Sequence, residues 1–398
     1  MKTGMVAYTF YEDDNRVRRY AEALAKRGDE VEVIAARPRG QAKEGVLKGV
    51  RVFRIYERLL NEKGKSDYFI RTTLFLLASF LKVTLRHLRR PYDVLHIHSI
   101  PDYEVFAALI PRLTGTKIIL DIHDLVPELF AGKFKKEPNH WMTKILRSVE
   151  KMCCSFSHHV IISNDLWRDR IVTRSVREEK CTALLNYPDS SIFNPDPPLE
   201  KNNSDAFICL YPGSLNYHQG VDIAVKACSL IQIPNLEFHI YGYGPLWELL
   251  EKQIREFNLQ QTVFLHDIVS LEEIAAVMGS ADLGIVPKRA EDFGNEAFST
   301  KTLEFMMLGV PIILSETRID KFYYNHSLVE FFKSGNEMDL AKKITYLYGN
   351  PHRRNELIEN GKAYAEQNIW ERKKQLYFDI VDAIPQKNKA RIPAKVRG

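Results

Sequence analysis

The sequence is poor in cysteine and has no long apolar run. Only five of its 398 residues are cysteines, and no two form a C-x-x-C pair. This excludes a disulfide-stapled mini-protein and favours the reduced, buried thiols of a cytosolic chain. The longest apolar stretch, 74–81, is far shorter than the roughly 20 residues of a membrane span, and the N-terminus lacks the basic-then-apolar pattern of a signal peptide. We therefore expect neither export nor a membrane-spanning helix.

Basic residues slightly outnumber acidic residues. The chain has 56 Lys and Arg against 51 Asp and Glu, a net charge of +5, which is too little to indicate nucleic acid. The charge is unevenly spread, because residues 1–190 hold 33 basic and 24 acidic residues, a net +9, and the rest of the chain carries −4. A basic first half favours an anionic partner such as phospholipid headgroups or a lipid pyrophosphate.

Short apolar runs alternate with amphipathic helical patterns along the chain. A helix is predicted over Asn15–Arg27 because Gly28 ends its pattern. Strands alternating with helices predict an α/β fold with doubly wound parallel sheets. The predicted strands are 5–10, 31–36, 50–55, 94–98, 117–121 and 160–163, followed by 207–211, 236–241, 263–266, 283–286 and 311–314.

A change of composition divides the chain in two. The segment 193–204 is rich in Pro and Asn and has little to bury, which is typical of a linker. We therefore predict an N-terminal domain over 1–190, a linker over 191–205 and a C-terminal domain over 206–370. A basic tail is predicted over 386–398.

Two glycine-containing segments follow predicted strands of the second half, where ligands bind in such folds. The segment 211–220, YPGSLNYHQG, precedes a helix whose N-terminus offers N–H groups to an anion. An ordinary strand–helix turn explains it equally well, and it is not a Walker loop. The glycines of 241–245, YGYGP, allow close approach of a flat ligand, or simply connect two elements. The residues singled out are Gly213, Ser214, Asn216, Gln219, Gly242 and Gly244.

The segment 296–304, EAFSTKTLE, is the most informative of the second half. Ser299 or Thr300 can cap a helix, and Lys301 lies in its first turn. A cation there opposes the helix dipole unless an anion binds, so the pattern predicts a phosphate site. The carboxylate of Glu304, one turn on, can accept two hydrogen bonds from a sugar diol. The alternative is a solvated helix face with a lysine and a glutamate.

Polar side chains also follow predicted strands of the first half. His96 and His98 end one strand, and His123 and Asp124 follow the next. Without a cysteine in the group, we expect no zinc site and predict instead that a histidine hydrogen-bonds a bound ligand. Arg16, between the first strand and the first helix, can reach into a cleft.

The segment 69–90 reads as a basic amphipathic helix. Its cations fall within an arc of about 100° on a helical wheel, and the rest is Leu, Phe and Ile. Such a helix lies on an anionic membrane surface, or it is a domain-surface helix with a solvated basic face. The arc comprises Arg71, Ser79, Lys82, Arg86, Arg89 and Arg90.

Taken together, these residues resemble the retaining glycosyltransferases of family four, the group 1 transferases. The resemblance rests on Glu296 and Glu304 in a Glu-x7-Glu pattern, on 309–311 (GVP), on 93–128 and on 368–370 (NIW). It implies a GT-B fold, with two Rossmann-like domains facing across a cleft. The first domain would bind the acceptor and the second the nucleotide sugar. A C-terminal helix, about 371–385, would return to complete the first domain.

The resemblance also implies roles for single residues. Glu304 would hold the ribose hydroxyls, Glu296 would contact the donor sugar, and His123 would lie at the reaction centre. The pyrophosphate would be surrounded by Ser299, Thr300 and Lys301, and the nucleoside bordered by Gly242 and Gly244. The catalytic set is thus His123, Glu296 and Lys301, with Arg16, His98 and Asp124 on the acceptor side.

The first loop departs from the family pattern. Ser214 and Gln219 stand where many members carry an arginine and a lysine that bind pyrophosphate. Lys301 must then supply the positive charge, with help expected from Lys288, Arg289 or Arg16.

The implied function is a retaining hexosyltransferase without a cofactor or a divalent metal. It would move a sugar, from a UDP-sugar by preference, to a lipid-linked glycan in surface or exopolysaccharide synthesis. The expected location is the cytoplasm, peripheral on the inner face of the plasma membrane through 69–90, with no nucleic-acid partner. The alternatives are a nucleotide-sugar epimerase on a similar fold and a non-catalytic nucleotide-sugar binding protein.

Overall fold

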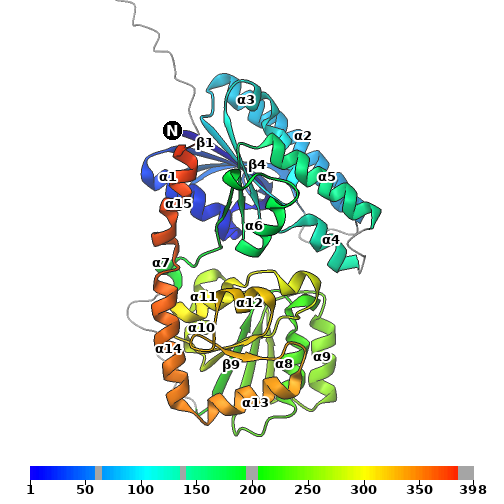
Figure 1. Cartoon of the computed structure of the whole chain (residues 1–398), viewed down its shortest axis with the longest axis vertical. Helices are drawn as coiled ribbons and strands as arrows, with labels where there is room; N and C mark the ends of the chain where they lie inside the picture. The colour runs from blue at the N-terminus through cyan, green and yellow to red at the C-terminus, as the bar shows by residue number, and fades with distance from the viewer. Residues whose placement is uncertain (59–64, 135–139, 194–204, 384–398) are drawn as a thin grey trace, which may run out of the picture. The chain divides into compact units, whose positions relative to one another are not determined.

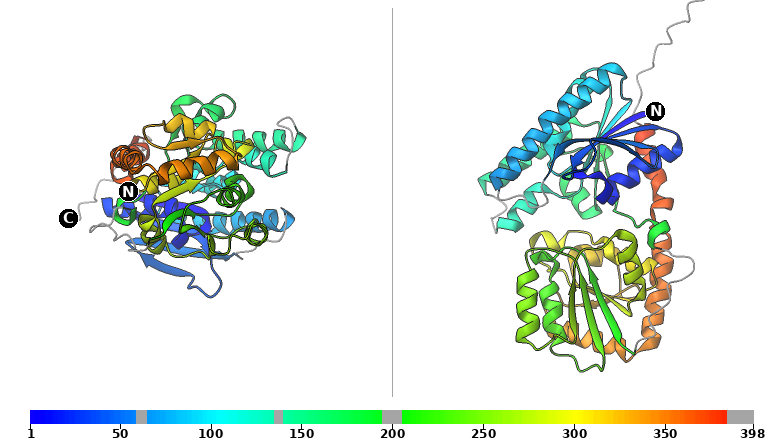
Figure 2. Two further views of the ribbon diagram at one scale, coloured as in Figure 1. Left: turned by 90° about the horizontal axis from the view of Figure 1, so that it is seen from below. Right: turned by 180° about the vertical axis from the view of Figure 1, so that it is seen from behind.

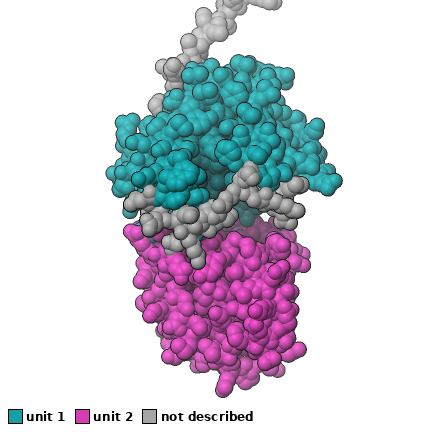
Figure 3. Space-filling model, turned by 90° about the vertical axis from the view of Figure 1, so that its right-hand side faces the viewer, with its two compact units in different colours: residues 1–185, 374–398 teal, residues 186–373 magenta. Residues whose placement is uncertain are grey.

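The structure is a computed structural model that describes residues 1–58, 65–134, 140–193 and 205–383 (Figure 1). The chain forms two compact units, Met1–Leu185 with Lys374–Gly398, and Asn186–Lys373 (Figure 3). Nearly all of the predicted linker, and the whole predicted basic tail, lie outside the described residues. Helices cover both faces of each sheet (Figures 1 and 2), as parallel sheets require.

The first unit is built on an eight-stranded sheet in the order β3-β4-β2-β1-β5-β6-β7-β8. All neighbours are parallel except β3 and β4. The six strands predicted for this unit are present, whereas β3 and β8 are not predicted because one is exposed and both are short. The strands are β1 (Lys2–Phe10), β2 (Glu30–Arg37), β3 (Glu44–Leu47), β4 (Val50–Glu57), β5 (Val94–His98), β6 (Lys117–Ile122), β7 (His159–Ile162) and β8 (Cys181–Ala183).

The helices of this unit begin with α1 (Asn15–Arg27), whose predicted bounds are confirmed. The side chain of Asp14 accepts from the first N–H groups of α1, and Gly28 ends the helix with a φ of 100°, which favours glycine. The remaining helices are α2 (Lys65–Arg89), α3 (Leu109–Leu113), α4 (Val126–Phe134), α5 (Trp141–Phe156) and α6 (Asp165–Val172), with the 3-10 helices η1 (Tyr11–Asp13), η2 (Asp102–Ala108) and η3 (Glu178–Lys180).

Helix α2 has a different orientation from the one its charge pattern suggested. Lys82 and Arg86 lie over the ring of Phe53 on β4 and pair with Glu44 and Glu32 of the sheet. Lys82 and Arg86 are therefore turned toward their own unit, whereas Arg89 and Arg90 of the same arc are exposed. By length and composition, Asp67–Arg89 is also apolar enough to cross a membrane, with a mean hydropathy of 1.4 over its most apolar window. The expectation based on 74–81 alone missed this.

The second unit is built on a six-stranded, fully parallel sheet in the order β11-β10-β9-β12-β13-β14. Its core includes Phe238, Ile285 and Phe332. The strands are β9 (Phe207–Pro212), β10 (Leu236–Tyr241), β11 (Val263–His266), β12 (Leu283–Val286), β13 (Ile312–Ser315) and β14 (Glu330–Phe332). The helices are α7 (Ser190–Phe193), α8 (Val221–Cys228), α9 (Trp247–Glu256), α10 (Leu271–Ser280), α11 (Thr300–Met307), α12 (Arg318–Tyr323), α13 (Glu337–Tyr348) and α14 (Pro351–Glu366), with η4 (Tyr217–Gln219) and η5 (Asp292–Asn295).

The last described helix, α15 (Trp370–Ala383), begins in the second unit and ends in the first. Tyr377 is fully buried in the first unit. Its ring stacks on Tyr20 with centroids 4.3 Å apart, and its hydroxyl lies 2.9 Å from Nδ1 of His96. The prediction that a C-terminal helix returns to the first domain is confirmed.

Candidate functional site

A cavity of about 360 Å³ opens at the carboxyl edge of the second sheet. It lies beside β9, whose neighbours β10 and β12 mark the point where the strand order reverses, the usual place for a ligand in an open α/β sheet. It contains six of the predicted donor-side residues, namely Gly213, Ser214, Gly242, Thr300, Lys301 and Glu304. The other lining residues are Phe193, Pro212, Tyr241, Tyr243, Ile268, Val269, Leu271, Ile274 and Met278.

Two glycine loops form one side of the cavity and pack backbone against backbone. The N–H of Gly213 donates to the carbonyl of Tyr241 over 2.8 Å. Gly242 has a φ of 153°, and a Cβ on it would lie 1.9 Å from the carbonyl oxygen of Gly213. Gly244 packs on the backbone of Leu215, where a Cβ would lie 2.8 Å from the carbonyl, but it does not line the cavity. Only glycine fits these contacts, so the loops leave room for a ligand above them.

Lys301 is the cation that lines the cavity. Its side chain lies across Gly213, with Cε 2.3 Å from the place of a Cβ on that glycine, and it makes no ion pair with another described residue within 4.0 Å. Burial lowers the pKa of Lys301 to about 8, although Glu304 opposes the shift. An unpaired cation in the first turn of α11 is unfavourable by itself, and an anion bound beside it would remove that cost.

Ser299 occupies the N-cap of α11 without capping it. It is 6% exposed, its side chain makes no cap hydrogen bond, and its Oγ has no partner among the described residues. The expectation that this hydroxyl caps the helix is therefore wrong, and Thr300 is already the first helical residue. The hydroxyl and the first N–H groups of the helix remain available as hydrogen-bond donors to an anion.

The cations expected to assist Lys301 are already occupied. Lys288 pairs with Asp320 over 2.8 Å and donates to the carbonyl of Ala297 over 2.8 Å. Arg289 makes two hydrogen bonds to Asp222, of 2.9 and 2.8 Å. Lys288 thus holds the turn that leads into α11 instead of facing a ligand. No local sequence pattern indicates these acidic partners, because they come from distant elements.

The remaining donor-side residues lie around the cavity rather than on its wall. Glu296 is 8% exposed and accepts a hydrogen bond of 2.9 Å from Nη1 of Arg318. Asn216 precedes η4, and Gln219, within it, has a buried Oε1 without a partner among the described residues. Burial, followed by the charge of Lys301, lowers the pKa of the neighbouring His218 to about 4, so that imidazole is neutral.

The first unit has a polar cluster at the carboxyl ends of β5 and β6, which pair with His98 opposite Asp121. Asp121 was not singled out in the sequence, although its place in the strand next to His123 is a signal. Its Oδ2 lies 3.2 Å from Nδ1 of His98 and 3.2 Å from Nε2 of His123. Arg16 makes two hydrogen bonds to the same carboxylate, of 2.8 and 2.7 Å, and a third to the carbonyl of Leu184.

The charges of this cluster are fixed by burial and by the ion pair. Burial opposes ionisation of Asp121, yet Arg16 and His123 hold the pKa of this carboxyl well below its usual range. Burial lowers the pKa of His98 and raises that of Asp124, which lies half-buried in the turn after β6. The guanidinium of Arg16 is 5% exposed, so Arg16 positions Asp121 and is not turned toward an acceptor.

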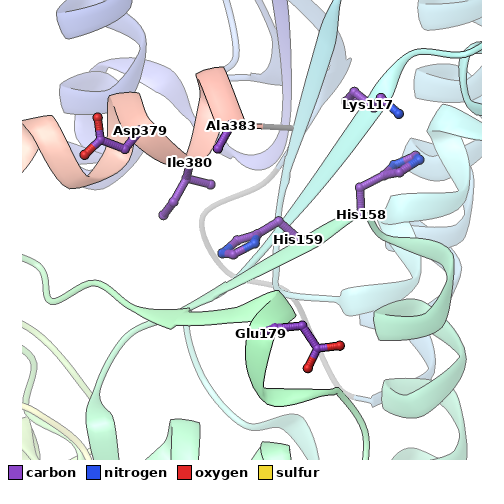
Figure 4. A pocket seen from close by; sticks show the side chains of 7 residues that line it. All are labelled: Lys117, His158, His159, Glu179, Asp379, Ile380 and Ala383. Atoms are coloured by element: carbon purple, nitrogen blue, oxygen red, sulfur yellow. The ribbon is translucent and has the colours of Figure 1, made fainter. Parts of the chain in front are cut away.

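The first unit also has a cluster of potential metal ligands and a second hollow, and neither is well suited to be a ligand site. Ligand atoms of His96, His98 and Asp121 lie within 4.8 Å of one another, but the guanidinium of Arg16 already binds both oxygens of Asp121, which does not suit a metal cation. A hollow of about 460 Å³ lies where β6 and β7 begin (Figure 4). It is at the amino edge of the sheet, opposite to the edge where ligands of such sheets bind.

Comparison with known proteins identifies the family. A profile described as "Glycosyl transferases group 1" matches residues 195–364, and one described as "Glycosyl transferase 4-like domain" matches residues 14–186. Among curated relatives, an uncharacterised glycosyltransferase of Methanocaldococcus jannaschii is 32% identical over 43% of this chain and 46% of its own length. An amylovoran biosynthesis glycosyltransferase of Erwinia amylovora is 30% identical over 38% of this chain and 37% of its own length. The chain thus matches less than half the length of each.

Solved structures show the same architecture over nearly the whole chain. A sucrose-phosphate synthase from Thermosynechococcus elongatus has a TM-score of 0.80 at 17% identity, covering 96% of this chain and 100% of that one. The Anabaena protein HepE, solved in complex with UDP, has a TM-score of 0.70 at 16% identity, covering 96% and 99%. The two matched domains and this likeness lead to one conclusion: the chain belongs to the group 1 glycosyltransferases of family four and has the GT-B fold.

Proposed function

We propose that this glycosyltransferase moves a hexose from a UDP-sugar to a lipid-linked glycan, with retention of configuration, in the synthesis of a surface or exopolysaccharide. The observation that supports it best is Lys301, a cation with no ion pair among the described residues, held against Gly213 in the wall of a cavity of the second unit. A nucleoside diphosphate is the ligand whose charge and flat base suit that cavity.

The donor would bind in three parts. Lys301, the hydroxyl of Ser299 and the first N–H groups of α11 would hold the diphosphate. The carboxylate of Glu304, which shares the cavity with Lys301, would accept hydrogen bonds from the ribose hydroxyls. The glycine loops and the apolar Ile268 and Val269 would leave a flat space for the base.

The transfer itself would need no nucleophile from the protein. The bond between the sugar carbon and the diphosphate oxygen breaks, and an acceptor hydroxyl oxygen forms the new bond on the same face of the sugar. The hydroxyl proton passes to the departing phosphate oxygen. Lys301 and the α11 N–H groups stabilise the negative charge that develops on the diphosphate. Glu296 would contact the donor sugar in the second unit, and Asp121 would orient His123 in the first.

The acceptor class is inferred from charge and from the relatives. The first half carries a net charge of +9, which suits a phosphate-bearing lipid carrier. The Erwinia relative is named for amylovoran biosynthesis, and HepE was solved with UDP-glucose as well as with UDP. Together these favour a UDP-hexose donor and an acceptor at the inner face of the plasma membrane.

A thermal-shift screen tests the donor assignment first. The protein is heated with UDP, GDP, ADP, dTDP or CMP, with and without magnesium. We expect stabilisation by UDP, independent of metal, weakened in Glu304→Ala and lost in Lys301→Ala. Stabilisation by another nucleotide would change the assignment of the donor's base. No stabilisation by any of them would contradict the donor site. UDP release from UDP-glucose that depends on added acceptor would separate a transferase from an epimerase and from a binding protein.

A further inference from the structure

Helix α2 presents a row of large apolar side chains to solvent. They recur every three or four residues, so they lie on one side of the helix, and from residue 70 to residue 88 the helix rises about 27 Å at 1.5 Å per residue. Leu77 is 59% exposed and Leu88 67%. Soluble monomers rarely leave so long an apolar row uncovered. The row consists of Ile70, Leu74, Leu77, Leu81, Leu85 and Leu88.

Helix α5 adds a second exposed row of different character. Trp141, Ile145 and Met152 are exposed, and they alternate along the same side of the helix with the exposed Lys144 and Lys151. Neither lysine makes an ion pair with another described residue. A side that mixes a tryptophan, aliphatic residues and lysines is typical of a helix in the headgroup region of a bilayer.

The two rows belong to one side of the first unit. Helices α2 and α5 lie on the same side of the first sheet (Figures 1 and 2), and η2 packs against both. We call the six residues of the α2 row and the five of the α5 row the α2–α5 face.

We propose that the α2–α5 face docks on the surface of an anionic lipid bilayer, with its apolar side chains in the headgroup region and its lysines against lipid phosphates. The inference deepens the proposed function, because it names the surface on which a lipid-linked acceptor would be reached, and it rests on that function for the acceptor's identity. Of the two alternatives that the sequence left open for 69–90, this is the membrane-surface helix, with the apolar row of α2 in contact with the lipid.

Charge favours a bilayer over a second copy of the chain. A symmetric dimer on this face would bring Lys144 and Lys151 of both copies together, and like charges would repel. Anionic headgroups would instead pair with them. Spanning is disfavoured by the inner side of α2, where Lys82 and Arg86 are held by the sheet. In a bilayer core these cations would have lost those partners.

Sedimentation of the full chain with vesicles tests the proposal. Vesicles of phosphatidylcholine with a quarter phosphatidylglycerol are compared with phosphatidylcholine alone. We expect the double variant Leu77→Glu/Leu81→Glu to lower binding to the anionic vesicles by more than about tenfold, because buried CH₂ groups are replaced by charge. Lys144→Glu/Lys151→Glu should lower it by roughly fivefold per lysine and weaken its dependence on salt.

Matched controls distinguish binding through the α2–α5 face from nonspecific binding through other exposed apolar side chains. Leu230→Glu/Met338→Glu changes two exposed apolar residues of the second unit and should bind vesicles as the unchanged protein does. The thermal shift with UDP checks that each variant is folded. It also separates the two proposals, because loss of UDP binding in the unchanged protein would contradict the proposed function and leave vesicle binding to be judged by itself.

Four outcomes would overturn the proposal. The first is no vesicle binding by the unchanged protein, and the second is equal binding by Leu77→Glu/Leu81→Glu. The third is a dimer in light scattering that this variant converts to a monomer while vesicles stay unbound, which would assign the face to a second copy. Resistance to extraction at high pH would instead make α2 a membrane span and would equally contradict docking.

Discussion

The carboxyl edges of the two sheets hold their cations in opposite ways. In the first unit, Arg16 is buried and bound to both oxygens of Asp121. In the second unit, Lys301 lines an open cavity and has only Glu304 as an acidic neighbour that raises its pKa. The first edge is completed by the chain's own side chains, and the second is left for a ligand. A cation at a sheet edge indicates a binding site only when its counter-charge is missing.

The largest effect on stability is expected when Arg16, the buried cation of the first unit, is replaced. Arg16→Met would leave the carboxylate of Asp121 buried without its counter-ion, which costs about 3–5 kcal/mol of unfolding free energy. Hydrogen–deuterium exchange of α1 and β6 in rising urea measures the loss. Arg18→Met is the control, because Arg18 forms a partly exposed pair with Glu22 in the same helix, which is worth less than about 1 kcal/mol. Equal losses would contradict the assignment.

Removing the second cation should affect the ligand and not the fold. Lys301→Gln should weaken UDP binding by about tenfold to 150-fold, because a charge-assisted hydrogen bond contributes about 1.5–3 kcal/mol. Titration calorimetry measures the affinity. Unfolding should be unchanged or slightly harder, since the uncompensated charge is gone. Lys252→Gln, on an exposed lysine of α9, should alter neither, and an unchanged affinity in Lys301→Gln would remove the diphosphate from this site.

The close contact of the two glycine loops allows a test that changes the shape of the cavity and leaves its charge unaltered. Gly242→Ala places a Cβ 1.9 Å from the carbonyl oxygen of Gly213, so the loops must separate, at a cost of about 1–3 kcal/mol that should appear in UDP affinity. Gly335→Ala is the control: its φ is also positive, but nothing lies within 4 Å of its Cβ. If both variants bind UDP equally, the close contact of the loops does not shape the cavity.

The smallest expected effect is that of pH. The pKa of Lys301 in the free protein is lowered to about 8, so its ammonium is charged at pH 7 and mostly neutral at pH 9. If only the charged form holds the diphosphate, UDP affinity should fall by about tenfold between these values. The affinity of Lys301→Gln should be flat over the same range. A slope shared by both proteins would place the titrating group elsewhere.

The sequence predicts the strands better than it predicts which side chains form ion pairs. The strand 94–98 was found with its bounds because an apolar run between polar segments is a local signal. β14, with three residues, is too short to give one. The ion pair of Arg16 and Asp121 joins residues 105 positions apart, and no local pattern announces it.

Helix α2 shows a second limit of the sequence. Its periodicity separates a basic side from an apolar side, but it does not say which of the two meets the sheet. The answer depends on Glu32 and Glu44, which lie on the distant strands β2 and β3 and attract the cations inward. For the same reason, the roles carried over from the family could not show that Lys288 and Arg289 are occupied by Asp320 and Asp222.

The return of α15 has a consequence for synthesis. Tyr377 fills a place between Tyr20 and His96 in the first unit, yet the ribosome makes it after the whole second unit. At 5–20 residues per second the wait is roughly 10–40 s. During that time the nascent first unit lacks part of its core, and the second unit can fold before the first is complete. A fusion or truncation at the C-terminus therefore acts on the N-terminal unit.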